Sequence, residues 1–244
     1  MRIIRSILAW VTGIFILVVF FPVTFIIWLV VLPFDPERRT IHCILMWQST
    51  LAIYLMPVWK VHISGKEKGL KDQVCVIISN HQSILDILII NCLRYRFKWV
   101  SKIENTRVPI LGWYLRMAGY ITVDRGNDES KAEMLARSYQ SLKKGVSLMI
   151  FPEGTRSLDG DPGFFKRGAF QLAIEAKVPI LPVVIDGTGS ILAKHSFVFR
   201  NENKIFLRVL DPVLPEDFGT ENPDELSIRF SELIKSELKK IRSK

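Results

Sequence analysis

The sequence predicts an α/β protein in which a mixed, largely parallel sheet is flanked by helices and preceded by an apolar two-helix hairpin. Two observations lead to this prediction. After Trp59, short apolar segments of strand length alternate with segments of helical periodicity, as in a sheet covered on both faces. Before Trp59, two long segments without any charged residue are separated only by the connector at residues 35–39. We therefore expect a membrane-anchoring hairpin at residues 1–59 and one α/β domain at residues 60–244, which is long enough for a full core.

The first uncharged segment runs from Ser6 to Phe34, and the second runs from Thr40 to Trp59. About 20 apolar residues are needed to cross a bilayer, so the first segment exceeds that length and the second just reaches it. The first segment is also too long for the apolar core of a signal peptide, and no small-residue cleavage site follows it, so we interpret it as retained. Pro22 should kink or break its helix. The alternative for the second segment is a helix buried in the core.

We expect the hairpin to be embedded in one leaflet of the inner membrane, with the α/β domain on the cytoplasmic face. The connector contains Asp35, Glu37, Arg38 and Arg39, and moving four charges across a bilayer is costly. Membrane lipids are therefore expected partners. A hairpin that spans the membrane twice is the alternative, and it leaves the α/β domain on the same side.

The chain carries 33 Lys and Arg residues against 24 Asp and Glu residues, a formal net charge of +9. No helix-turn-helix, zinc-finger or RNA-binding motif accompanies this excess, so we do not expect nucleic acid as a partner. Beside a membrane element, a basic surface favours anionic lipid headgroups and negatively charged substrates. Cys43, Cys75 and Cys92 lack the spacing of metal ligands, so we expect reduced packing residues and no metal site.

The apolar segments of the α/β domain predict seven strands, at Lys60–Ser64, Val74–Ser79, Lys98–Ser101, Tyr120–Asp124, Ser147–Phe151, Ile180–Ile185 and Ile205–Leu210. Helical periodicity predicts five helices, at Ser83–Leu93, Ile110–Ala118, Asp128–Lys143, Arg167–Ala176 and Pro223–Arg242. The last helix is the best marked, because Asn222 can cap it, Pro223 takes its first position and Glu225 stands in its first turn.

The segment from Val76 to Leu88 joins the end of a buried strand to the start of a helix, and His81 lies in the turn between them. Ser83 is the expected N-cap, which puts Asp86 at the third helical position, where a carboxylate can reach back to the cap. The histidine can then face this carboxylate, which would fix its tautomer and leave the other ring nitrogen free as a general base. Open α/β sheets also bind ligands at strand ends. The alternative is a turn histidine beside an aspartate that complements the helix dipole.

A second polar segment, residues 151–157, follows the strand at Ser147–Phe151. Pro152 ends the strand, Gly154 lets a ligand approach the backbone, and Arg156 offers a guanidinium that can grip phosphate at two points. The glycine, lysine and serine pattern of a P-loop is absent. An ordinary turn with a solvated arginine is the alternative. Three more cations stand near expected strand or helix ends and are candidate phosphate ligands: Lys102, Lys166 and Arg167.

These residues together resemble the 1-acyl-glycerol-3-phosphate O-acyltransferase family of phospholipid synthesis. Residues 80–86, with Asn80, His81 and Asp86, are similar to its first motif, residues 151–157 to its third, and residues 178–184 to its fourth. The second motif is matched by Lys102, Glu104, Pro109, Gly112, Gly119, Asp124 and Arg125. The four motifs occur in the family's order between residues 79 and 188. One departure is Asn105, where the family often has an apolar residue.

The resemblance implies the glycerolipid acyltransferase fold and a reaction. An acyl chain would move from a thioester, acyl-CoA or an acyl carrier protein (acyl-ACP), to the 2-hydroxyl of lysophosphatidic acid and give phosphatidic acid. His81 and Asp86 would be catalytic, while Glu153, Gly154 and Thr155 would help to hold the glycerol-phosphate end. Asn80, Ser83 and Pro152 would support them. No cofactor or metal ion is implied beyond the acyl donor as co-substrate.

Direct transfer is the expected route, because the glycine-serine-glycine elbow of a serine acyl-enzyme is absent from the sequence. Two other functions stay open. The same scaffold can act on another lysophospholipid or amphipathic acceptor, and loss of activity without the phosphate group would separate this case. A catalytically silent lipid-binding protein at the membrane surface is the second, and the intact pair of His81 and Asp86 argues against it.

Overall fold

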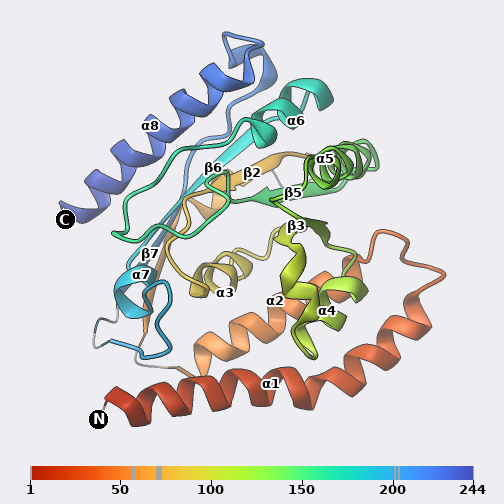
Figure 1. Cartoon of the computed structure of the whole chain (residues 1–244), viewed down its shortest axis with the longest axis vertical. Helices are drawn as coiled ribbons and strands as arrows, with labels where there is room; N and C mark the ends of the chain where they lie inside the picture. The colour runs from red at the N-terminus through yellow and green to blue at the C-terminus, as the bar shows by residue number, and fades with distance from the viewer. Residues whose placement is uncertain (1, 57–58, 70–72, 201, 203, 244) are drawn as a thin grey trace.

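The computed structural model describes residues 2–56, 59–69, 73–200, 202 and 204–243. Seven strands form one sheet in the order β1-β7-β6-β2-β5-β3-β4 (Figure 1). Their bounds are β1 (Lys60–Ser64), β2 (Val76–Ser79), β3 (Phe97–Lys102), β4 (Ile121–Val123), β5 (Ser147–Ile150), β6 (Ile180–Asp186) and β7 (Lys204–Val209). All neighbouring strands are parallel except β6 and β7, which are antiparallel. The predicted mixed, largely parallel sheet is therefore confirmed, and each strand lies where the sequence predicts it, within two residues.

Helices cover both faces of this sheet, with α5, α6 and α8 on one side and α1 to α4 on the other (Figure 1). Their bounds are α1 (Arg2–Val31), α2 (Arg39–Tyr54), α3 (Leu85–Asn91), α4 (Leu111–Met117), α5 (Asp128–Lys143), α6 (Gly168–Ala176), α7 (Thr188–Ile191) and α8 (Pro223–Arg242). The sequence analysis does not predict α7, because four residues are too few to show a helical period.

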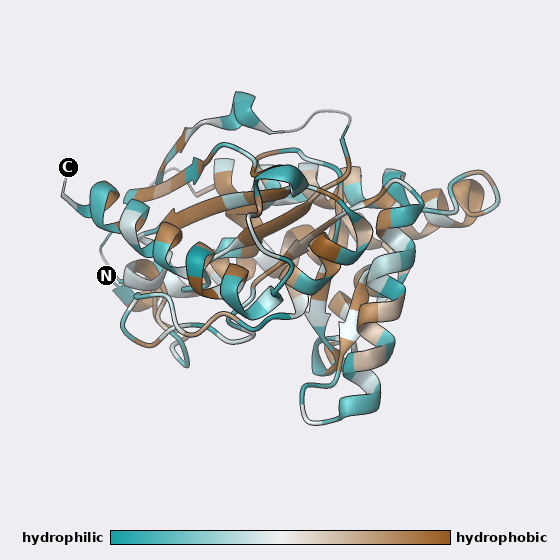
Figure 2. Cartoon of the chain, turned by 90° about the horizontal axis from the view of Figure 1, so that it is seen from above, coloured by the Kyte–Doolittle hydropathy of each residue, from teal (hydrophilic) through white to brown (hydrophobic). Residues whose placement is uncertain are grey.

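The central strands β2, β5 and β6 are apolar on both faces, since the helices exclude water from each side of the sheet. All four residues of β2 are buried, and Figure 2 shows the strands as a hydrophobic interior behind helices with hydrophilic outer faces. A parallel sheet covered on both sides requires such continuous apolar strands. Two clusters of buried side chains fill the spaces between sheet and helices, one on each face.

The last helix follows its predicted signals. The Asn222 side chain accepts a hydrogen bond from the backbone N–H of Asp224 at 2.9 Å, which caps α8 as expected. Its buried stripe, which includes Leu226, Phe230 and Ile234, packs against the sheet and α6. The stripe carries the C-terminal end of α8 to the edge of the sheet where β6 ends, and this edge holds the candidate site.

The first helix differs from the prediction at Pro22. We expected a kink or break; α1 is not broken but is one helix of 30 residues that passes through Pro22 and bends along the domain (Figure 1). Its inner face packs on both sides of the proline, because Phe21 and Phe25 contact the aromatic residues Tyr114 and Trp113 of α4. This packing stabilises the helix against the single hydrogen bond that proline removes.

The second apolar segment forms α2, and much of this helix is buried against α3. His42 Nδ1 and the Tyr120 hydroxyl are 2.8 Å apart, and Asn91 Nδ2 donates to Ser49 Oγ at 2.9 Å. These polar contacts belong to the core, so the interpretation as a buried helix fits this face of α2. In the described part of the chain, α1 alone is long and apolar enough to cross a membrane. Residues 1, 57 and 58 of the expected hairpin lie outside the described residues.

Candidate active site

The site begins where β2 ends, and the side chain of Asn80 sets its position. Asn80 Nδ2 donates to the carbonyl oxygen of Ile185 at 2.8 Å, and the Ile185 N–H donates back to Asn80 Oδ1 at 3.0 Å. The buried amide thus extends the ladder between β2 and β6 by one step. The next residue, His81, is therefore released from the sheet at a fixed point.

The structure brings His81 and Asp86 together. His81 Nδ1 and Asp86 Oδ2 are 2.7 Å apart, and the Asp86 side chain is completely buried. The same oxygen accepts from the backbone N–H groups of Gln82 at 2.7 Å and Ser83 at 2.9 Å. The aspartate therefore reaches back over the start of the helix, as the capping pattern predicts.

The cap itself differs from the prediction. Helix α3 begins at Leu85 with Ile84 as its N-cap, so Ser83 stands one residue before the capping position. The Ser83 hydroxyl donates to the carbonyl oxygen of Leu192 at 2.7 Å, while its oxygen accepts from the Leu85 N–H at 3.4 Å. This hydrogen bond to Leu192 joins the turn that contains His81 to the segment after α7.

Two polar residues of the site have no counterpart in the sequence analysis. Thr188, at the start of α7, donates its hydroxyl to Asp86 Oδ1. Gln82 Nε2 donates to the carbonyl oxygen of Gly160 at 2.9 Å and to Asp186 Oδ1 at 3.0 Å. The Thr188 hydroxyl and the backbone N–H groups of Gln82 and Ser83 all donate to Asp86, as an acceptor-only carboxylate requires. The available signal for Thr188 was its place just after β6, at the same sheet edge as His81.

Both the ring and the backbone of His81 are held in place. Its ring stacks on Phe151 with centroids 3.9 Å apart and planes 7° apart. Its backbone N–H donates to Glu153 Oε1 at 2.7 Å, and its carbonyl oxygen accepts from the Ser157 N–H at 2.8 Å. Nε2 has no hydrogen-bond partner among the described residues, while the side chain is 15% exposed. The ring is therefore fixed with one nitrogen open to a substrate.

Glu153 supports the histidine turn with both carboxylate oxygens. Oε1 accepts from the His81 N–H, and Oε2 accepts from the Gly163 N–H at 2.9 Å. The residue is 6% exposed, and burial raises the pKa of its carboxyl above the ordinary value, although both hydrogen bonds lower it. Both oxygens are engaged inside the protein, so the contact that Glu153 makes here is with the backbone of the site.

The predicted phosphate ligands do not all meet. Arg156 and Thr155 lie on the loop after β5, which contacts the His81 turn through Ser157. Lys166 lies beside that loop, since a Cβ added to Gly154 would stand 3.2 Å from its Nζ. The other two predicted cations are paired: Lys102 Nζ is 2.6 Å from Glu104, and Arg167 is 3.9 Å from Asp224 at the start of α8.

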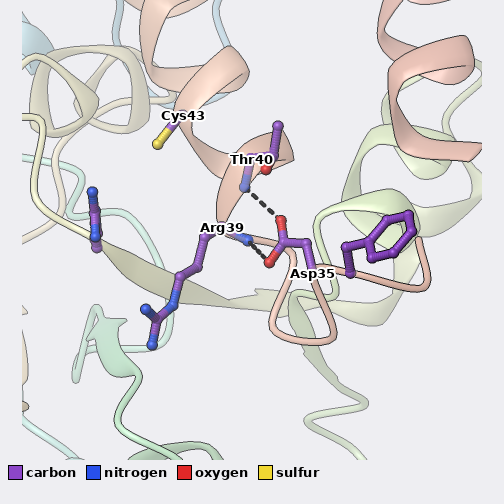
Figure 3. A pocket seen from close by; sticks show the side chains of 6 residues that line it. Asp35, Arg39, Thr40 and Cys43 are labelled. Carbon is purple, nitrogen blue, oxygen red and sulfur yellow. Dashed lines mark hydrogen bonds between the residues drawn. The ribbon is translucent and has the colours of Figure 1, made fainter. Parts of the chain in front are cut away.

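An open surface pocket lies away from His81. A pocket of about 510 Å³ is lined by Phe34, Asp35, Arg39, Thr40, Cys43 and Arg96 (Figure 3). Asp35 accepts there from the backbone N–H groups of Arg39 and Thr40 at the start of α2. Arg96 precedes β3, so this pocket is at the edge where β3 begins, while His81 lies where the parallel strand β2 ends. We therefore build the site on the chemistry at His81.

Among the described residues, no group of three or more His, Cys, Asp or Glu side chains could hold a metal ion. The site instead consists of an imidazole, its buried carboxylate and a basic loop. Such a set can remove a proton from a hydroxyl and bind an anion next to it.

Comparison with known proteins identifies relatives of this arrangement. A family model described as Acyltransferase matches residues 60–186. A chloroplastic 1-acyl-sn-glycerol-3-phosphate acyltransferase of Arabidopsis thaliana is 39% identical over 186 residues, which are 75% of this chain and 51% of that protein. The 1-acyl-sn-glycerol-3-phosphate acyltransferase of Saccharomyces cerevisiae is 31% identical over 179 residues, 72% of this chain and 59% of that protein. The chain thus spans about half the length of the curated relatives it matches.

One solved structure matches this chain over its whole length. The crystal structure of the 1-acyl-sn-glycerophosphate acyltransferase PlsC from Thermotoga maritima is 27% identical and superposes with a TM-score of 0.84. The match covers 100% of this chain and 99% of that one. The similarity therefore includes the N-terminal helices as well as the sheet.

Proposed function

This chain belongs to the acyltransferase family, and from that premise we propose that it makes phosphatidic acid. It would transfer an acyl chain from an acyl thioester to the 2-hydroxyl of 1-acyl-glycerol-3-phosphate. The observation that carries the proposal is the His81 imidazole, bonded to buried Asp86 through Nδ1 and open at Nε2. The names of the relatives supply the substrate class.

The proposed reaction needs one general base and no acyl-enzyme intermediate. With Nδ1–H donated to Asp86, the Nε2 lone pair of His81 accepts the proton of the 2-hydroxyl. The hydroxyl oxygen bonds to the thioester carbonyl carbon, the carbon–sulfur bond breaks, and the imidazolium returns the proton to the departing thiolate. The carboxylate of Asp86 stabilises the imidazolium while it exists. Coenzyme A and acyl carrier protein both fit this chemistry as carriers.

The loop after β5 is the proposed site for the acceptor's phosphate. Arg156 has no carboxylate partner among the described residues, and its loop contacts the His81 turn directly. A guanidinium bound to the phosphate would place the 2-hydroxyl relative to Nε2, so binding energy would also contribute to the rate. Arg156→Ala should then raise the acceptor KM, and Arg156→Lys should not restore it fully, because an ammonium lacks the planar fork.

Helix α1 is proposed to lie in the membrane surface. One of its faces is apolar and exposed along the whole helix: Ile3, Ile4, Ile7, Leu8, Val11, Ile14, Phe15, Val18, Val19, Val23, Ile26, Leu29 and Val30. The opposite face is attached to the domain, since Trp10 Nε1 donates to the Phe197 carbonyl oxygen at 2.8 Å and Tyr114 donates to that of Leu17 at 3.1 Å. A helix attached along its length fits insertion into one leaflet.

The connector between α1 and α2 supports embedding over spanning. Glu37 forms an ion pair with Lys98 of β3, with 2.7 Å between Oε2 and Nζ, and both side chains are largely buried. This contact holds the connector against the catalytic domain. A connector on the far side of the bilayer would have to break this pair and leave the buried Lys98 ammonium without its partner. Membrane lipids are therefore proposed partners, and a two-tailed product would return to the bilayer beside the site.

The enzyme assignment is tested by incubating the purified full chain with labelled lysophosphatidic acid and a panel of acyl-CoA and acyl-ACP donors. We expect labelled phosphatidic acid, and a loss of about 10²–10⁴ in rate for His81→Ala at unchanged fold. The control is His62→Ala, because His62 is exposed on the edge strand β1. A His81→Ala variant that keeps more than about a tenth of the activity would show that another group is the base.

The same assay separates the alternatives. Equal rates on lysophosphatidic acid and on monoacylglycerol would mean that the phosphate is not recognised, and another amphipathic acceptor would replace it. No transfer to any acceptor, with retained binding to lipid vesicles, would identify a lipid-binding protein without catalysis.

Membrane attachment is tested with a single cysteine at Pro36, an exposed position in the connector, in a chain without other cysteines. Sealed vesicles carrying the protein are treated from each side with an impermeant maleimide. Labelling only from the side of the catalytic domain is the result expected for embedding. Labelling only from the opposite side would show that the hairpin spans, and would leave the enzyme assignment unchanged.

A further inference from the structure

A lysine outside the four motifs, Lys194, contacts the loop after β5. Lys194, in the segment that follows α7, donates from Nζ to Thr155 Oγ1 at 3.0 Å and to the carbonyl oxygen of Arg156 at 2.8 Å. These two acceptors belong to the segment proposed to bind phosphate. A lysine far away in sequence therefore reaches the centre of the site, while two of the predicted cations, Lys102 and Arg167, are paired with carboxylates.

A second ammonium group lies beside the same loop. A Cβ added to Gly154, whose φ is +68°, would stand 3.2 Å from Lys166 Nζ, so a side chain there would be strained and would press on the lysine. Lys166 therefore lies next to residue 154, while Lys194 contacts residues 155 and 156. Arg156 itself belongs to this loop, so three cationic residues lie on or beside one short segment.

Arg156, Lys166 and Lys194 form a basic cluster. None of the three forms a salt bridge with a carboxylate in the described ranges of the chain. The adjacent Glu153 is buried, and its two oxygens already accept from backbone N–H groups. Three cations without a salt-bridge partner on one loop make a favourable local site for a doubly charged anion.

The segment that carries Lys194 is anchored at both ends. On one side, the carbonyl oxygen of Leu192 accepts the Ser83 hydroxyl from the histidine turn. On the other side, the Phe199 N–H donates to Ser6 Oγ of α1 at 2.9 Å, and the ring of Trp10 contacts Phe199. Little conformational entropy remains for Lys194 to lose when a ligand binds, so its contact contributes more to affinity.

We propose that Lys194 is a further phosphate-binding residue of this enzyme. Two of its three ammonium hydrogens hold the backbone and side chain of the loop, and the third is donated to a phosphate dianion that Arg156 and Lys166 also contact. The cluster would favour a terminal phosphate monoester, with two charges, over a phosphodiester headgroup with one. The inference rests on the proposed function for the identity of the substrate, but the anion site itself does not depend on it.

Phosphate occurs on both expected substrates, so the experiment has to identify the source. Lysophosphatidic acid ends in a phosphate monoester, and acyl carriers also contain phosphate groups. We compare wild type with Lys194→Met, Lys194→Arg and a control, Lys235→Met, whose lysine is exposed on α8. Each variant is assayed for kcat and for the KM of acceptor and donor, on lysophosphatidic acid, on a lysophospholipid with a phosphodiester headgroup, and on monoacylglycerol.

The expected result is a rise of about tenfold or more in the lysophosphatidic acid KM for Lys194→Met, at a kcat within about threefold of wild type. Lys194→Arg should recover much of the loss, the control should match wild type, and the KM for monoacylglycerol should not change. A rise confined to the donor KM would support a phosphate contact and identify the donor as its source. Unchanged KM values for both substrates, or an equal loss with and without the acceptor phosphate, would overturn the proposal.

A binding measurement keeps this inference separate from the enzyme assignment. Inorganic phosphate should raise the melting temperature of wild type and of Lys235→Met, and should raise that of Lys194→Met much less. Equal stabilisation of all three proteins would overturn the role of Lys194 even if the enzyme makes phosphatidic acid. Phosphate-dependent stabilisation that needs Lys194, in a protein without acyl transfer, would overturn the proposed function and leave the anion site standing.

Discussion

Replacing Asp86 with asparagine removes one charge while keeping the shape of the side chain, and the structure defines what remains. Oδ2 accepts from His81 and from the backbone N–H groups of Gln82 and Ser83, and Oδ1 accepts from Thr188. The two backbone donors cannot turn, so the amide oxygen must take the place of Oδ2. The amide NH₂ then faces the Thr188 hydroxyl, which can rotate to accept. Nδ1–H of His81 therefore keeps an acceptor and its tautomer, but loses the negative charge.

The size of the effect follows from the imidazolium that forms during transfer. Two unit charges about 4 Å apart interact by about 4 kcal/mol at the effective dielectric constant of about 20 typical of proteins. Each 1.4 kcal/mol is a factor of ten in rate, so we expect kcat to fall by about 10²–10³. This loss is close to that of His81→Ala, and its expected cause is the lost charge, because the amide oxygen still fixes the tautomer of His81.

The assay measures kcat at saturating donor and acceptor for Asp86→Asn and for Thr188→Val, with melting temperatures to check folding. Thr188→Val removes one donor and keeps the charge, so its kcat should fall by about tenfold or less. An Asp86→Asn enzyme that melts like wild type and keeps more than about a tenth of kcat would refute the stabilisation of an imidazolium by this carboxylate. Equal losses in the two variants would show that the carboxylate's placement matters more than its charge.

Three further predictions concern the support of the site and the core. Glu153→Gln leaves one of two backbone N–H groups facing an amide NH₂, so the protein should lose about 1–3 kcal/mol of stability in urea unfolding and its kcat should fall. Gly154→Ala should raise the acceptor KM in steady-state kinetics, because φ is +68° and Lys166 would be displaced, whereas Gly145→Ala, in open space at φ +80°, should not. Burial lowers the pKa of His42 to about 4, below its ordinary 6.5, so the unfolded chain binds more protons between these values. Stability should therefore fall by about 3 kcal/mol as the pH drops from 6.5 to 4, and a His42→Gln variant that shows the same slope in urea titrations would contradict this.

The predictable part of the fold is the part governed by local pattern. The central strands β2, β5 and β6 are continuous apolar segments because both faces of the sheet are covered there. The α8 cap at Asn222 depends on neighbours in sequence. The break considered at Pro22 does not occur, because packing of α1 on α4 keeps the helix continuous. The environment of helix α2 could not be predicted, because its apolar composition fits a membrane and a protein core equally well.

In the site, too, the contacts between residues close in sequence were predictable and the contacts between distant segments were not. His81 and Asp86 are five residues apart in one turn, so the sequence was enough to expect their contact. Thr188 and Lys194 reach the site only because β6 ends beside β2, whose other neighbour is β5, and no local pattern encodes this arrangement. Arg167 was a reasonable candidate at the start of α6, but its side chain meets Asp224 on α8 instead.

The attachment of α1 to the domain has a geometric consequence for substrate choice. The helix is fixed near both ends, by Ser6 and Trp10 to the segment at 197–199 and by Thr24 to Gln48 of α2 at 3.3 Å. With α1 in the leaflet, the protein itself sets the height of His81 Nε2 relative to the headgroup plane. A hydroxyl is then selected by its depth in the membrane as well as by its chemistry. Lysolipids whose free hydroxyl lies one bond nearer to the water would meet the base less often, even with the same phosphate.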